Sequence, residues 1–124
     1  MKPLTIVIVE DEMLLHAEYE RVIGQAFSGS VFHTLTTSEG LVETAKQVNP
    51  DLVITDLVMD STHEGISGIS RLREYDPQIP IIVVSGHGDF MEIADAFRID
   101  GRLQKPINDN QLIEAINNVL GVAS

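Results

Sequence analysis

Three short runs of β-forming residues constrain most strongly what this chain can fold into: Leu4–Val9, Leu52–Thr55 and Ile81–Val84. Each run is short for a helix, and its apolar residues do not alternate with polar ones. Such runs are typical of strands buried on both faces, as in a parallel sheet covered by helices. Wholly apolar stretches such as Ile6–Val9 are far shorter than the roughly 20 residues of a membrane span.

Amphipathic patterns occupy the intervals between these runs. Apolar residues recur at spacings of four, three and four in the first interval, at Leu15, Tyr19, Val22 and Ala26, which is the pattern of a helix with one buried face. Ser38 is predicted to cap a second helix, and Asp76-Pro77 to end a third one. Two further helices are predicted, over Asp89–Phe97 and after a cap at Asn108.

Two weaker runs complete the pattern, at Val31–Thr36 and Arg102–Gln104. Five strands alternating with five helices predict an α/β fold, in which helices cover both faces of a doubly wound parallel sheet. The sequence shows no repeat or linker, and 124 residues is the length of one domain. We therefore expect residues 1–124 to form a single domain.

Charge and composition exclude several functions. The chain has 8 Lys+Arg against 19 Asp+Glu, a formal net charge of −11, and no cysteine. An acidic surface repels phosphate backbones, so we expect no direct contact with nucleic acid. Disulfides, thiolate nucleophiles and iron–sulfur clusters are excluded. With no signal peptide and no membrane segment in the pattern, we expect a soluble, cytoplasmic protein.

Polar residues stand where the predicted strands end. Glu10 and Asp11 follow the first strand, Asp56 the third, Ser85 the fourth and Lys105 the fifth. In a doubly wound sheet, binding sites form at the carboxyl ends of the strands. The fold thus predicts that these five side chains meet at one edge.

Their chemistry indicates a metal-dependent phosphoryl site. Three carboxylates in close contact are unfavourable unless they share a cation, and oxygen ligands together with water suit Mg²⁺. Ser85 and Lys105 are donors for an anion such as a phosphoryl group. Asp56 would accept that group, because carboxylates form aspartyl-phosphate intermediates.

Each of these residues, taken alone, has a simpler interpretation. Glu10 and Asp11 could cap the following helix, and Asp56 could be an ordinary loop residue. Ser85 could serve a turn, and Lys105 could be a solvated surface charge. The complete set, with one group at each of four strand ends, is much harder to ascribe to chance.

The pattern resembles the receiver domain of bacterial two-component response regulators over essentially the whole chain. Four segments carry the resemblance: Ile6–Glu12, Pro50–Met59, Pro80–Gly86 and Lys105-Pro106. It implies a flavodoxin-like fold with strand order 2-1-3-4-5. It also implies phosphotransfer from a histidine kinase or a phosphotransfer protein, and signalling to a downstream protein target or output domain rather than enzymatic turnover.

The resemblance also implies roles for individual residues. Asp56 would be the phosphoacceptor, Ser85 the switch hydroxyl, and Lys105 the partner of the phosphoryl group. The Mg²⁺ ligands would be Asp11, paired with Glu10, together with Asp56 and the backbone carbonyl of Val58. A cis peptide bond before Pro106 would aim Lys105 inward.

Three features depart from the family pattern. Met59 is followed by Asp60 instead of proline, and Glu64-Gly65 stands where Asp-Gly usually opens the third helix. The position three before the lysine, usually Tyr or Phe, is Arg102. Burying an unpaired arginine is costly, so we expect Arg102 to point outward. There it would contact an acidic partner or a second subunit in a phosphorylation-dependent homodimer.

Other functions compete with this one. A haloacid-dehalogenase-type phosphatase would need a second acid where Val58 stands. A flavin carrier would not place Glu10-Asp11-Glu12 against a phosphate. A receiver-like interaction module that is never phosphorylated, and the N-terminal receiver of a longer regulator, both remain open.

The four histidines lack the spacing of a metal site. We expect His16, His33 and His63 to be solvated. His87 lies two residues after Ser85, where it would either influence water access to the phosphoryl group or simply occupy a loop.

Overall fold

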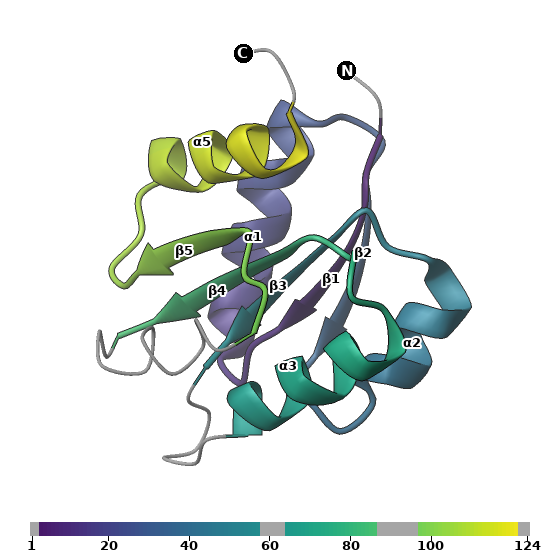
Figure 1. Ribbon diagram of the computed structural model, residues 1–124. Helices are drawn as coiled ribbons and strands as arrows, with labels where there is room; N and C mark the ends of the chain where they lie inside the picture. Colours follow the sequence, from purple (N-terminus) through teal and green to yellow (C-terminus); the bar gives the residue numbers. More distant parts are fainter. Residues whose placement is uncertain (1–2, 58–63, 87–96, 122–124) are drawn as a thin grey trace.

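The computed structural model describes residues 3–57, 64–86 and 97–121, and a five-stranded parallel sheet forms its centre (Figure 1). The strand order is β2-β1-β3-β4-β5. This confirms the α/β class and the order implied by the family resemblance. The strands are β1 (Thr5–Val9), β2 (Val31–Leu35), β3 (Leu52–Asp56), β4 (Ile81–Ser85) and β5 (Gly101–Gln104).

Four helices occur within the described residues: α1 (Met13–Ala26), α2 (Leu41–Val48), α3 (Glu64–Tyr75) and α5 (Asp109–Leu120). The helix predicted over Asp89–Phe97 falls almost entirely on residues 87–96, outside the described part of the chain. Within that part, no helix combines the length and the apolar character needed to cross a membrane.

Alternate residues of the central strands build two separate hydrophobic cores, because successive side chains of a strand point to opposite faces. On one face, Ile6, Ile8 and Ile54 pack with residues of α1 and α5. On the other, Val7, Val9 and Val53 pack with residues of α2 and α3. Figure 1 shows the two helix pairs on opposite sides of the sheet. Burial on both faces explains why these strands read as continuous apolar runs.

The predicted cap of the last helix is confirmed. Asn108 Oδ1 accepts a hydrogen bond from Gln111 N at 2.8 Å, and the Asn108 backbone N–H donates to Gln111 Oε1 at 3.0 Å. This is a complete capping box, which fixes where α5 begins directly after the Lys105-Pro106 segment.

The predicted cap at Ser38 is wrong. The N-cap of α2 is Gly40, and it makes no side-chain capping hydrogen bond. Ser38 is buried and packs under α3, where a Cβ added to Gly68 would lie 2.6 Å from the Ser38 Cβ. Arg71 Nη2 donates to the backbone and side-chain oxygens of Ser38 at 3.3 and 3.4 Å. Tertiary packing therefore decided the role of this serine.

Candidate functional site

The turn between β1 and α1 carries the first two acidic residues. Glu10 is 1% exposed, and Asp11 beside it is half-buried. The backbone N–H of Glu10 donates to Leu35 O at 2.9 Å, which continues the β1–β2 pairing by one step. Glu10 Oε2 accepts from the backbone N–H of Glu12 at 3.3 Å. The chain therefore enters the turn in a fixed direction.

Asp56 ends β3 at the same edge of the sheet. Val9 pairs with Thr55 in the parallel register, so the residue after each of them stands at the edge beside the other. Asp56 is 5% exposed, and the next residue, Leu57, donates its N–H to Val84 O at 3.0 Å. The residues on both sides of Asp56 are thus hydrogen-bonded into the sheet, and this fixes the position of its carboxylate.

The three carboxylates converge as predicted. Oxygen atoms of Glu10, Asp11 and Asp56 lie within 4.8 Å of one another. Lys105 Nζ lies 2.9 Å from Asp56 Oδ2 and 3.0 Å from Glu10 Oε1. The Lys105–Pro106 peptide bond is cis, which confirms the geometry implied by the family resemblance.

The electrostatics show that one ammonium does not balance this cluster. The pKa of Glu10 is raised from 4.5 to about 7: burial is the main cause, the hydrogen bond with Asp11 and the charge of Asp56 add to it, and Lys105 opposes it. For Lys105, burial opposes the charged form, but hydrogen bonds to Asp56 and Glu10 outweigh it and raise the lysine pKa. The site therefore has an excess of negative charge, which a divalent cation would neutralise.

Ser85 lies at the same edge, at the end of β4. It is fully buried, and its carbonyl accepts a hydrogen bond from the backbone N–H of Lys105 at 2.9 Å. Asp56 pairs with Val84 in the parallel register, so Ser85 extends one residue beyond that pair. Val58, Asp60, His63 and His87 lie outside the described residues.

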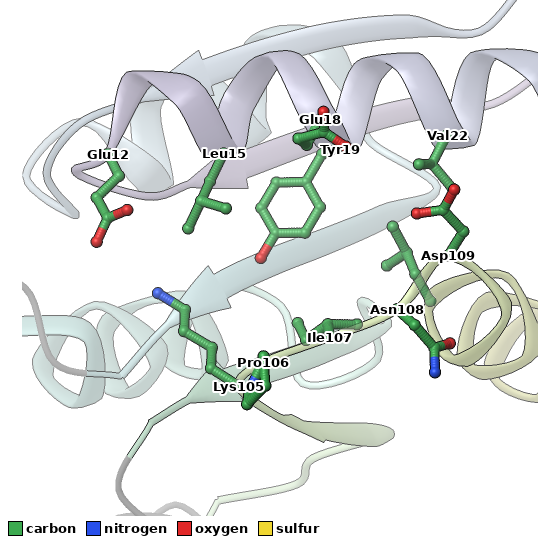
Figure 2. Close-up of a pocket in the computed structure, with 11 residues that line it drawn as sticks. Glu12, Leu15, Glu18, Tyr19, Val22, Lys105, Pro106, Ile107, Asn108 and Asp109 are labelled. Atoms are coloured by element: carbon green, nitrogen blue, oxygen red, sulfur yellow. The ribbon is translucent and has the colours of Figure 1, made fainter.

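A groove of about 450 Å³ opens beside Lys105, between α1 and the start of α5. In Figure 2 the lysine side chain extends toward α1, and the ring of Tyr19 projects into the same space. Tyr19 is 5% exposed, and burial together with the charge of Glu10 raises its pKa. The walls are mainly apolar, with the carboxylates of Glu12, Glu18 and Asp109 at the sides.

The prediction that His16 is solvated is wrong. Its side chain is buried, and its Nε2 lies 2.5 Å from the backbone oxygen of Glu10. A signal was present in the sequence, because His16 precedes Tyr19 by three and Ile23 by seven residues, and both of those are buried on α1. His33 on β2 is partly buried rather than fully solvated.

Arg102 is exposed on the edge strand β5, opposite Val83 in the register. The expectation that it points away from the core is confirmed. Glu64, which stands where the family usually has aspartate, is the first residue of α3.

The sheet has the strand order, and its carboxyl edge has the acidic residues and the lysine, that the resemblance to receiver domains implied. Residues 6–117 match the response regulator receiver domain family. The chain belongs to that family.

Named relatives agree with this assignment. The chain is 30% identical over 118 residues to the glycerol metabolism activator of Pseudomonas putida, covering 93% of this chain and 53% of that protein. It is 28% identical over 116 residues to the chemotaxis protein CheY of Thermotoga maritima, covering 92% of this chain and 95% of that protein. Thus it spans about half of the first relative and nearly all of the second.

Solved structures support the fold. A two-component response regulator of the LuxR family from Aurantimonas sp. superimposes with a TM-score of 0.86 at 21% identity. The match covers 97% of this chain and 86% of that one.

Proposed function

We propose that residues 1–124 form one phosphoacceptor receiver domain that is phosphorylated on Asp56 in a Mg²⁺-dependent reaction. The observation that carries the proposal is the contact of Lys105 Nζ with Asp56 Oδ2 at 2.9 Å, beside two further carboxylates. A buried carboxylate with a fixed ammonium and an excess of neighbouring negative charge is suited to accept a phosphoryl group while a cation balances the charge.

The residues present fit Mg²⁺. Their donor atoms are carboxylate oxygens, which this hard cation prefers, and they lie close enough together to share one ion. Glu10, Asp11 and Asp56 would hold it, with the backbone carbonyl of Val58. When bound, Mg²⁺ supplies positive charge to the phosphoryl oxygens and to the attacking carboxylate.

In the reaction, an Asp56 carboxylate oxygen attacks the phosphorus of a phosphohistidine. The new P–O bond forms as the P–N bond breaks, and the electron pair of that bond leaves with the imidazole, which then takes a proton from solvent. The product is an acyl phosphate on Asp56. Lys105, already hydrogen-bonded to Asp56, would stabilise the negative charge on the transferred group.

The signal would be transmitted through Ser85. A phosphoryl group adds charge and acceptor oxygens beside the end of β4, and these would draw the Ser85 hydroxyl and the chain after it toward Asp56. Because Arg102 stands where an aromatic residue usually moves inward, the change would act through Ser85 and backbone shifts. Arg102 would stay exposed, as a cationic contact for a partner or a second subunit.

Response regulators work with histidine kinases and with output domains, and we infer the same partner classes here. A histidine kinase or phosphotransfer protein would supply the phosphoryl group. The target would be a downstream protein or an output domain. Since the chain spans about half of the P. putida activator, the receiver of a longer regulator is part of this proposal.

The test is phosphorylation by a small acyl phosphate with Mg²⁺. Intact mass should increase by one phosphoryl group, and Asp56→Asn should abolish the increase. Asp51→Asn is a matched control, because Asp51 is an acid at the opposite end of β3 that bonds to the backbone N–H of Thr5. This variant should still be labelled.

Two results would contradict the proposal. Labelling that persists in Asp56→Asn would move the acceptor to another residue. A wild-type protein that is labelled neither by the acyl phosphate nor by any histidine kinase would favour the alternative, a receiver-like interaction module that is not phosphorylated.

A further inference from the structure

His16 is a buried histidine that the proposed chemistry does not use. It lies four residues into α1, and its side chain is directed back toward the amino end of the helix, because helical side chains tilt that way. Its Nε2 lies 2.5 Å from the backbone oxygen of Glu10. A carbonyl oxygen can only accept a hydrogen bond, so Nε2 carries the proton and donates.

This bond holds the peptide unit that joins the two acidic residues of the turn. The Glu10 carbonyl and the Asp11 N–H belong to one planar unit, so fixing the oxygen also fixes the plane from which Asp11 extends. Glu10 is buried, and its carbonyl would be costly to leave without a donor. His16 supplies that donor from the helix that the turn leads into.

The start of α1 has no side-chain cap. Its N-cap, Glu12, makes no side-chain capping hydrogen bond, and the first turn of the helix contains no acidic residue. The Glu12 N–H instead bonds to the Glu10 side chain at 3.3 Å, which is one of the carboxylates that would bind the metal. The His16 bond restrains the turn without using a carboxylate oxygen.

We infer that His16 is a positioning residue for the acidic site: its Nε2–H bond to the Glu10 carbonyl sets the orientation of Glu10 and Asp11 toward a divalent cation. The inference rests on the proposed function. It means that a residue of α1 holds the turn between β1 and α1 in the orientation that binds the cation.

The experiment compares Mg²⁺ affinity, measured by calorimetry on the full chain, for three variants. His16→Leu fills the space without a donor and should raise the Mg²⁺ dissociation constant about 10-fold, as is common when a group that orients a ligand is lost. His16→Gln retains an amide donor at similar reach and should stay within about 2-fold of wild type. Val22→Ala removes buried volume from the same helix without touching the turn, and should lower stability with unchanged affinity.

A second measurement needs no substitution. The ¹⁵N spectrum of the wild-type imidazole should show a proton on Nε2 of His16, both with and without Mg²⁺. Phosphorylation of His16→Leu by an acyl phosphate should be slow at low Mg²⁺ and should recover at saturating Mg²⁺, because a positioning defect raises the Mg²⁺ requirement and leaves Asp56 intact.

The inference would be overturned if wild type binds Mg²⁺ and His16→Leu binds it equally well, or if Nε2 is unprotonated in wild type. A fall in the affinity of His16→Gln equal to that of His16→Leu would also overturn it. If wild type itself binds no Mg²⁺ and accepts no phosphoryl group, the proposed function fails, and the inference fails with it.

Discussion

Charged side chains are paired differently at the two ends of the sheet. At the carboxyl end, the carboxylates of Glu10, Asp11 and Asp56 lie together, and Lys105 contacts those of Glu10 and Asp56. At the amino end, Arg73 reaches from the last turn of α3 to Asp100 at 3.2 Å and to the carbonyls of Ile79 and Arg98 at 2.6 and 2.9 Å.

The polar groups at the amino end satisfy one another. Asp100 Oδ2 also accepts from the backbone N–H of Ile81 at 2.9 Å, and Arg98 Nη1 donates to Gln78 Oε1 at 2.7 Å. These bonds tie α3 to the residues that precede β4 and β5. Charges matched in this way stabilise a fold, whereas unmatched charges at a strand end are typical of a site that awaits a ligand.

The largest expected loss of stability comes from a substitution at the amino end of the sheet. The Arg73 side chain is 9% exposed, and Arg73→Ala leaves Asp100 and two carbonyls without their shared donor. We expect it to lower the free energy of unfolding by about 3 kcal/mol in urea titrations. Arg98→Ala, at a 56% exposed side chain, is the control and should cost under about 1 kcal/mol. Equal losses of unfolding free energy in the two variants would show that the buried contacts of Arg73 do not stabilise the fold more than those of exposed Arg98.

Mg²⁺ bound by the acidic residues at the carboxyl end of the sheet should raise the free energy of unfolding. At a concentration about ten times its dissociation constant, a cation that binds only the native state adds about 1.4 kcal/mol. Thermal unfolding with millimolar Mg²⁺ should therefore occur at a higher temperature than unfolding in a chelator. Asp11→Ala should reduce the difference, and Asp51→Asn should leave it intact. Identical wild-type melting temperatures would count against a metal site.

Without metal, the crowded carboxylates should make stability depend on pH. The pKa of Glu10 is raised from 4.5 to about 7 by burial and by its acidic neighbours, so between these values the native state binds more protons than the unfolded state. Stability should then fall as pH rises from 4.5 to 7. In a chelator at pH 7.5, Glu10→Gln should be more stable than wild type by about 1 kcal/mol. A destabilised Glu10→Gln would mean that the Lys105 bond outweighs the crowding.

The smallest effect on the fold is expected on the edge strand. Arg102→Ala, at an exposed position, should leave stability within about 0.5 kcal/mol and phosphorylation of Asp56 unchanged. Pull-down or light scattering with and without phosphodonor should show weaker partner binding or dimerisation. Ser85→Ala should be labelled but should fail to change its binding on labelling. Normal binding by phosphorylated Arg102→Ala would exclude the contact role.

Much of the site could be predicted because strand ends are visible in a sequence. Continuous apolar runs locate the strands, and the parallel topology brings their ends to one edge, so the sequence alone predicts that Glu10, Asp56 and Lys105 lie together. The roles of Ser85 and Val58 remain predictions. Ser38 could not be assigned in this way, because its environment is set by Gly68 and Arg71, which lie far along the chain.

By itself, the sequence determined the fold class, the start of the last helix and the residue types at the carboxyl edge, since these depend on local periodicity and capping. Only the tertiary structure decided the burial of His16, the Arg73–Asp100 contact and the sharing of Lys105 by two carboxylates. These depend on which side chains from distant segments occupy the same space. Local patterns record hydrophobicity and backbone preference, but distances between distant groups are set by how the helices pack on the sheet.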